Sequence, residues 1–121
     1  MPTYHVIIAD DSDAVRAMLV QIIGRIYPTA TISPVPDGAE ALRVYRQHGA
    51  DLLITDQDMP RLRGLDLIRI LHTQQVTIPI ILLSSDPSIQ AQAQTAGVAL
   101  FLLKPFSVTR LTQVVRQILP P

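Results

Sequence analysis

The sequence predicts an α/β fold, (βα)5, in which five strands alternate with five helices as a doubly wound, three-layer sandwich around a parallel sheet. Two observations predict it. Short unbroken runs rich in Ile, Val and Leu recur along the chain, and such runs are typical of strands that are covered on both faces. Between them lie stretches with apolar residues at three-four spacing, which is typical of helices with one buried face.

The strands are expected at five apolar runs: Val6 to Ala9, Thr31 to Val35, Leu52 to Thr55, Ile78 to Leu83 and Ala99 to Leu103. The first helix is expected to begin at Ser12 or Asp13, because polar residues of this kind cap free helix amides. Its buried stripe comprises Val15, Met18, Leu19, Ile22 and Ile23. This order of elements gives a strand, then a helix, from the start of the chain.

The second helix has the best-marked start, because Asp37 and Glu40 have the spacing that caps a helix beginning at Gly38. The inward residues of the remaining helices follow in chain order: Ala41, Leu42 and Tyr45; then Leu65, Ile68 and Leu71 after Gly64; then Val108, Leu111, Val115 and Ile118. The segment Ser88 to Ala96 has a weaker helical pattern, and Gly97 is expected to end it.

The amino-acid composition excludes several classes of function. The 121 residues form one domain, with no linker and no output domain expected, and no apolar stretch is long enough to span a bilayer. Ten basic and ten acidic residues give a net charge of zero, which disfavours a broad electrostatic grip on nucleic acid or on anionic membranes. The absence of cysteine excludes thiol chemistry and cysteine-ligated zinc, and without a secretory leader a cytoplasmic protein is expected.

Polar side chains follow four of the predicted strands at the edge where parallel sheets bind ligands. In chain order they are Asp10 and Asp11, Asp56 and Asp58, Ser84 and Ser85, and Lys104 followed by Pro105. Carboxylates that converge repel one another, and a divalent cation such as Mg²⁺ relieves this repulsion while it binds phosphate oxygens. Lys104 and Ser84 offer further phosphate contacts, and a carboxylate can act as the nucleophile. The set therefore indicates phosphoryl transfer.

These residues resemble, in order and spacing and along nearly the whole chain, the response regulator receiver domain of two-component signalling. The acidic pair Asp10-Asp11, Asp56 within DLLITDQDMP, Ser84 and Lys104-Pro105-Phe106 carry the resemblance. It implies a CheY-like, flavodoxin-like sheet with strand order 2-1-3-4-5. It also implies that a sensor histidine kinase or phosphotransfer protein donates a phosphoryl group to Asp56, so that the chain is a phosphoacceptor and not an enzyme.

The resemblance also implies individual roles. Mg²⁺ or Mn²⁺ would be held by Asp11, Asp56 and the backbone carbonyl of Asp58, with Asp10 acting in the second shell or through a water. The Lys104-Pro105 peptide would be cis and would direct Lys104 at the phosphoryl oxygens. Phe101 would turn inward as Ser84 moves toward the phosphoryl group, which changes the face made by the fourth helix, fifth strand and fifth helix. An unidentified downstream protein would bind this face, and a phosphorylation-dependent homodimer is a further partner that the resemblance allows.

Departures from the family pattern affect rates and partners. Thr55 replaces the usual aliphatic residue and adds a hydroxyl that needs a hydrogen-bond partner. Asp58 places a second carboxylate near the phosphoryl group, and Arg61 and Arg63 make this loop locally basic. Taken alone, Asp10 and Asp11 could be helix caps, Ser84 an ordinary loop hydroxyl, and Phe101 a fixed core aromatic.

Three other functions compete. Asp56-Gln57-Asp58 resembles the DxD pair of haloacid dehalogenase-type phosphatases, but those enzymes carry the pair after their first strand. A flavodoxin-like cofactor binder would need a phosphate-binding loop after the first strand, where the acids Asp10, Asp11 and Asp13 would repel phosphate. A receiver that signals without phosphorylation is disfavoured because Asp11, Asp56, Ser84 and Lys104 are all present.

Overall fold

The computed structural model of the protein describes residues 3–121. Its elements, in chain order, are β1 (His5–Ala9), α1 (Asp13–Ile26), β2 (Thr31–Val35), α2 (Gly38–His48), β3 (Leu52–Asp56), α3 (Gly64–Thr73), β4 (Ile80–Ser84), η1 (Pro87–Ile89), α4 (Gln90–Thr95), β5 (Leu100–Leu103) and α5 (Val108–Ile118). The 3-10 turn η1 leads directly into α4. The predicted alternation of five strands and five α-helices is confirmed over these residues.

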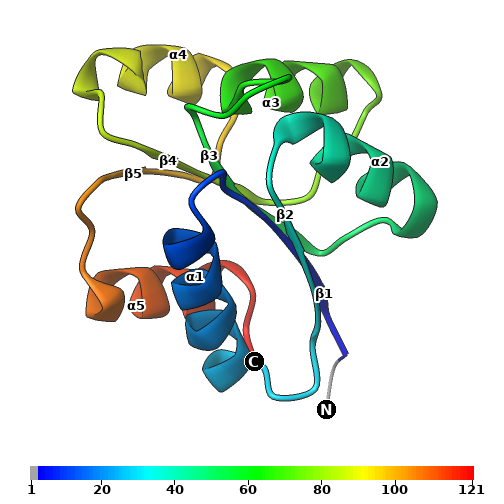
Figure 1. Ribbon diagram of the computed structural model, residues 1–121, viewed down its shortest axis with the longest axis vertical. Coiled ribbons are helices and arrows are strands. Elements are labelled where there is room, and N and C mark those ends of the chain that lie inside the picture. Colours follow the sequence, from blue (N-terminus) through cyan, green and yellow to red (C-terminus); the bar gives the residue numbers. More distant parts are fainter. Residues whose placement is uncertain (1–2) are drawn as a thin grey trace.

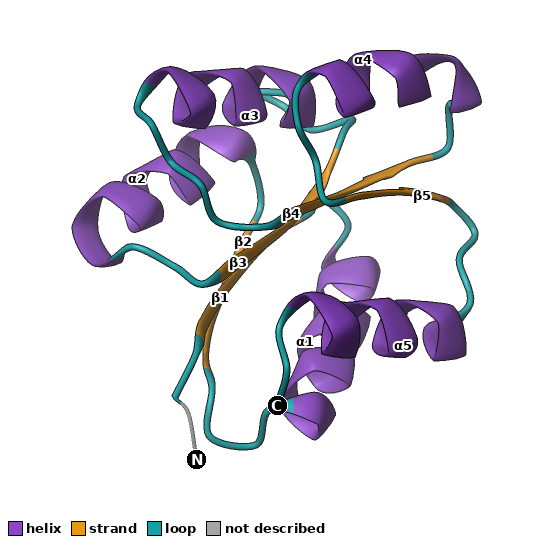
Figure 2. Ribbon diagram, turned by 180° about the vertical axis from the view of Figure 1, so that it is seen from behind, coloured by secondary structure: helices purple, strands orange, loops and turns teal. Residues whose placement is uncertain are grey.

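The strands form one parallel sheet in the order β2-β1-β3-β4-β5, as predicted. Helices α2, α3 and α4 cover one face of the sheet, and α1 and α5 cover the other, so the fold has three layers (Figure 1; Figure 2). No helix in the described part of the chain is both long and apolar enough to cross a membrane.

The core consists of two apolar clusters, one on each face of the sheet. Successive strand residues point to opposite faces, so β3 sends Leu53 to the cluster under α2 and α3 and Ile54 to the cluster under α1 and α5. Every residue of β3 and β4 is buried, which confirms that these central strands are covered on both faces. A rigid, apolar platform therefore lies directly beneath the polar strand ends.

The limits of β2 were predicted correctly, but its expected coverage on both faces was wrong. β2 lies at the sheet edge and leaves Thr31 and Pro34 exposed, which suits a proline because it has no amide to donate. Several other strand limits were wrong: β1 begins at His5 and not at Val6, and β5 begins at Leu100 and not at Ala99. β4 begins at Ile80 and not at Ile78, directly after Pro79. Both β3 and β4 extend one residue further than expected, so that Asp56 and Ser84 are the last residues of their strands.

Side-chain caps fix the helix starts that the sequence predicted. The Ser12 hydroxyl accepts a hydrogen bond from the Val15 amide, and the Asp37 carboxylate accepts one from the Glu40 amide at 2.9 Å. The expected burial of Met18 and Val108 was wrong, because these side chains are 36% and 50% exposed at the edges of their helical stripes. These exposed residues do not change the layer order.

Candidate functional site

The register of the sheet brings the predicted site residues to one edge. Ala9 lies beside Thr55 in the sheet, Asp56 beside Leu83, and Ser84 beside Leu103. The Lys104 amide continues this ladder by donating to the Ser84 carbonyl at 2.9 Å. Because the strands end in step, the residues that follow them form one continuous polar row.

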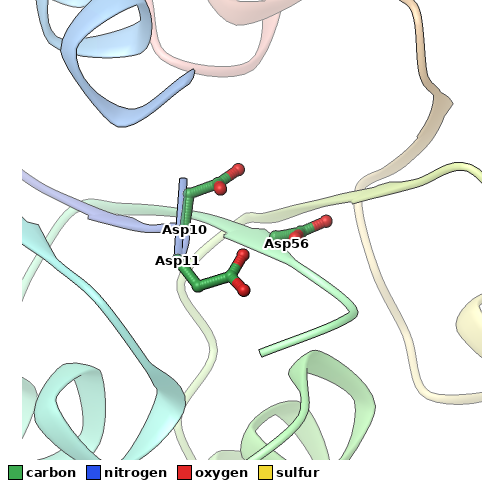
Figure 3. A group of neighbouring side chains, drawn as sticks. All are labelled: Asp10, Asp11 and Asp56. Carbon is green, nitrogen blue, oxygen red and sulfur yellow. The ribbon is translucent and has the colours of Figure 1, made fainter. Parts of the chain in front are cut away.

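Three carboxylates meet in this row. One carboxylate oxygen from each of Asp10, Asp11 and Asp56 lies within 4.8 Å of the other two, which is close enough for all three to contact one metal ion. Asp10 and Asp11 come from the end of β1 and Asp56 from the end of β3 (Figure 3). Asp10 and Asp56 are buried and Asp11 is exposed, so solvent reaches the group at Asp11.

Lys104 supplies a positive charge to the buried side of this group. Its Nζ lies 3.1 Å from Asp56 Oδ1 and 3.3 Å from Asp10 Oδ2, and the lysine side chain is only 24% exposed. The Lys104-Pro105 peptide bond is cis. One ammonium therefore bridges two of the three carboxylates.

The electrostatics of Asp56 and Lys104 reflect this arrangement. Burial raises the pKa of Asp56, helped by the nearby charge of Asp10, while the hydrogen bond and charge of Lys104 only partly offset the rise. Burial alone would lower the pKa of Lys104, but its hydrogen bonds and its attraction to Asp56 and Asp10 raise that pKa above its usual range. The Asp56 carboxylate thus has too little positive charge around it for its degree of burial.

The other predicted residues make no hydrogen bond or ion pair with the three carboxylates within residues 3–121. Ser84 is fully buried, and its hydroxyl accepts a hydrogen bond from the Asp86 amide at 3.0 Å. Phe101 pairs in the sheet with Leu82, lies half-buried against the α2–α3–α4 side of the core, and shares that face with Ser84. The Asp58 side chain is exposed in the loop after β3.

Sequence reasoning missed two side chains that shape the site. The Arg16 guanidinium, on the first turns of α1, donates to the Asp10 backbone carbonyl at 2.7 Å. Gln57 is buried, and its side-chain oxygen accepts from the Leu65 amide at 2.8 Å while its backbone carbonyl accepts from the Gly64 amide. Strand alternation would have identified Gln57, because it points to the α3 face, opposite to Asp56.

Two of the departures from the family pattern have hydrogen-bond partners, Thr55 at the end of β3 and Arg61 in the loop after it. The Thr55 hydroxyl donates to the Asp56 backbone carbonyl at 2.9 Å, which answers its need for a partner. The Arg61 Nε donates to the carboxylate of Asp37 at 2.8 Å. Arg61 is therefore more than a solvated charge, since it joins the loop after β3 to the start of α2.

Known proteins have sequences similar to this one. The model of the response regulator receiver domain matches residues 6–116. An uncharacterized response regulatory protein of Staphylococcus epidermidis is 36% identical over 114 residues, which are 92% of this chain and 45% of that protein. The glycerol metabolism activator of Pseudomonas putida is 30% identical over 119 residues, 96% of this chain and 54% of that protein. The chain thus spans about half the length of these curated relatives.

Solved structures share the fold. The N-terminal domain of an uncharacterized protein from Wolinella succinogenes superposes with a TM-score of 0.87 at 29% identity, covering 96% of this chain and 94% of that one. The chemotaxis protein CheY4 of Vibrio cholerae superposes with a TM-score of 0.85, covering 98% and 100%, and at 24% identity it supports the fold alone. The chain therefore belongs to the response regulator receiver domain family, phosphoacceptor signalling domains of two-component systems that are not true enzymes.

Proposed function

We propose that this receiver accepts a phosphoryl group from the phosphohistidine of a histidine kinase, or of a phosphotransfer protein, onto Asp56 in a Mg²⁺-dependent reaction. One observation carries the proposal: Asp56 lies within metal-sharing distance of Asp10 and Asp11, while Lys104 reaches it from the buried side. The receiver unit is taken as residues 1–121, and it acts in the cytoplasm, where ATP-dependent kinases have their substrates.

The charges of the site fit a hard divalent cation. Three carboxylates face one ammonium, so the fully ionised group carries two excess negative charges. Burial, together with the nearby charge of Asp10, raises the pKa of Asp56. Asp11, Asp56 and the backbone carbonyl of Asp58 would ligate the ion, and Asp10 would act through a water or from the second shell. When bound, Mg²⁺ (or Mn²⁺) neutralises charge on the transferring phosphoryl oxygens.

The transfer step is a nucleophilic displacement at phosphorus. An oxygen of the ionised Asp56 carboxylate forms a bond to phosphorus as the nitrogen–phosphorus bond of phosphohistidine breaks. The electron pair of that bond returns to the imidazole nitrogen of the donor, which needs no oxidant or reductant. Lys104 Nζ lies 3.1 Å from Asp56 Oδ1 and would donate a hydrogen bond to a phosphoryl oxygen once the phosphoryl group is on Asp56.

Signalling would proceed from Ser84 to Phe101. The Ser84 hydroxyl would leave the Asp86 amide and donate to the phosphoryl group, which frees space for Phe101 on the same face of the sheet. Helix α4 is suited to respond, because it is short and buries only Ala93. The α4-β5-α5 face would then bind a downstream protein or a second phosphorylated copy, with no direct contact to nucleic acid or membrane.

Asp58 would adjust how long the phosphoryl group survives. Its side chain is exposed beside the acceptor, so it can repel anionic donors or orient the water that hydrolyses the aspartyl phosphate. Replacing Asp58 with Asn therefore tests lifetime separately from acceptance.

The direct test is incubation with a small phosphodonor and Mg²⁺, followed by intact-protein mass spectrometry. The protein should gain one phosphoryl group, chelation of Mg²⁺ should prevent the gain, and Asp56→Asn should not gain it. A wild-type protein that gains nothing would favour a receiver that signals without phosphorylation. An equal gain by Asp56→Asn would remove Asp56 as the acceptor.

A further inference from the structure

The loop that follows Asp56 is held in a tight turn centred on Arg61. The Leu62 amide donates to the Pro60 carbonyl at 2.7 Å, which closes a three-residue turn, and Arg61 at its centre has φ +67°. This left-handed form of the three-residue turn is rare and strained for any residue with a Cβ. The surrounding contacts must therefore hold Arg61 in place.

Asp37 provides the contact that holds it. This acid is fully buried at the start of α2, and its two oxygens are divided between two donors: the Glu40 amide at 2.9 Å and Arg61 Nε at 2.8 Å. Burial opposes its charge, but these hydrogen bonds and the Arg61 charge lower the pKa of Asp37 below its usual range. Asp37 is thus a buried acid whose ionised form is stabilised, and it anchors the Arg61 side chain.

Close packing also restricts the backbone of the loop. A Cβ at Gly38 would lie 2.4 Å from the Leu62 carbonyl oxygen, so the start of α2 and the loop have no room to move closer. At the root of the loop, a Cβ at Gly64 would lie 2.4 Å from the Asp56 carbonyl oxygen. The segment between Asp56 and Gly64 is therefore fixed at its root by Gln57 and in its middle by Arg61.

We propose that the Asp37–Arg61 ion pair is a positioning device that sets how well the Asp58 carbonyl ligates the metal, a role that rests on the proposed function above. Asp58 lies between the two fixed points of the loop and has no side-chain anchor of its own in the described chain. The Arg61 side chain is 70% exposed, so its burial cannot be what holds the turn. The positioning effect of the pair would reach the metal site through the loop.

The proposal predicts a change in Mg²⁺ affinity opposite in sign to the change expected from charge alone. Removal of a positive charge near a divalent cation site should tighten cation binding, because one repulsion is lost. Removal of a positioning contact should weaken it, since the carbonyl ligand is no longer held. Arg63, two residues away in the same loop, makes no side-chain hydrogen bond or ion pair within residues 3–121, so Arg63→Ala reports the charge effect alone.

The test is calorimetric titration of Mg²⁺ into the wild type, Arg61→Gly, Arg61→Lys and Arg63→Ala, well below their unfolding temperatures. Arg61→Gly relieves the left-handed strain and should remain folded, yet it should bind Mg²⁺ about tenfold more weakly than wild type. Arg61→Lys, which can still donate to Asp37, should recover part of the affinity. Arg63→Ala should bind as tightly as wild type or more tightly.

Hydrogen exchange without metal gives a second readout. The Gly64 and Leu65 amides, both bonded to Gln57, should exchange faster in Arg61→Gly than in Arg63→Ala. Unchanged or tighter Mg²⁺ binding by Arg61→Gly would overturn the positioning role and leave the proposed function intact. A wild type that binds no Mg²⁺ would overturn both.

Discussion

Two buried aspartates, one at the start of a helix and one at the end of a strand, show how the same type of side chain can be fully compensated in one region and incompletely compensated in another. Asp37, at the start of α2, and Asp56, at the end of β3, are 0% and 5% exposed. Each is paired with one cation, Arg61 or Lys104. Yet the pKa of Asp37 is lowered and that of Asp56 is raised.

The difference lies in what else surrounds each carboxylate. Asp37 accepts a hydrogen bond from a backbone amide of the helix it caps and does not share Arg61 with a second buried acid within residues 3–121. Asp56 shares its lysine with Asp10, whose charge raises the pKa of Asp56 further. A satisfied acid stabilises the fold, whereas an acid with unmet charge is prepared for a cation or a phosphoryl group.

The lowered pKa of Asp37 and the raised pKa of Asp56 have opposite effects on how the stability of the fold depends on pH. Asp37 contributes stability that is present above the unfolded-state pKa of about 4, and this contribution is lost as pH falls through its lower folded pKa. For Asp56 the folded state binds the proton more tightly, so stability falls as pH rises from about 4 through its raised pKa. Above that pKa the cost of the Asp56 charge is constant.

The largest effect is expected from removing the cation of the functional acid. Lys104→Ala should slow phosphorylation by a small phosphodonor by about 10²-fold or more, because one preorganised charge on the transferring group is lost. The rate of phosphoryl mass gain measures this. Mg²⁺ should meanwhile bind Lys104→Ala at least as tightly as wild type, since a neighbouring positive charge is gone. A normal rate in Lys104→Ala would remove Lys104 from the chemistry.

Loss of the structural acid should come next. Asp37→Ala should lower the free energy of unfolding by about 2 kcal/mol at pH 7, through the lost helix cap and ionic hydrogen bond. Urea denaturation measures it, and the difference from wild type should shrink as the pH falls below about 4 toward the lowered pKa of Asp37. Asp37→Asn keeps the cap acceptor and should lose less. An unchanged unfolding free energy at pH 7 would show that Asp37 is not the anchor described above.

Loss of the functional acid should have the opposite sign. In the absence of Mg²⁺, Asp56→Asn should raise the free energy of unfolding by about 1 kcal/mol at pH 7, because a buried charge with incomplete compensation is removed. The gain should vanish near pH 4. Mg²⁺ at ten times its Kd should stabilise the wild type by about 1.4 kcal/mol and Asp56→Asn by much less. If Asp56→Asn instead lowered the free energy of unfolding, Asp56 would be an acid that stabilises the fold, as Asp37 does.

The smallest effect is expected beside the acceptor. Thr55→Val removes the hydroxyl that donates to the Asp56 carbonyl and should cost about 0.5 kcal/mol of unfolding free energy, with phosphorylation unchanged. Urea denaturation and the phosphorylation rate check both parts. A tenfold slower reaction would instead make the Thr55 hydroxyl part of the functional region.

The sequence was sufficient to predict the fold and to predict that the three acidic side chains lie close together. Strand alternation and the rule that parallel strands end at one edge predicted that Asp10, Asp11 and Asp56 would converge, and they do. The cap at Asp37 was equally readable, because its partner Glu40 is local.

The remainder depends on contacts between distant segments. The pairing of Arg61 with Asp37 spans 24 residues and needs a left-handed turn at Arg61, which no local pattern in the sequence favours. Arg16 reaches the Asp10 carbonyl only because of the orientation of α1 on the sheet. The exposure of Met18 and Val108 likewise follows from how far neighbouring elements extend over each helix.

The most direct test locates the phosphoryl group. Borohydride reduces an aspartyl phosphate to an alcohol with loss of phosphate and leaves free carboxylates unchanged, so tandem mass spectrometry can identify the modified residue. Trypsin would place Asp56 and Asp58 in the peptide 47–61 and Asp10 and Asp11 in the peptide 1–16. Reduction at Asp56 alone is the expected result. Reduction at Asp58 or in the peptide 1–16, with Asp56 unmodified, would contradict the assignment of Asp56 as the phosphoacceptor.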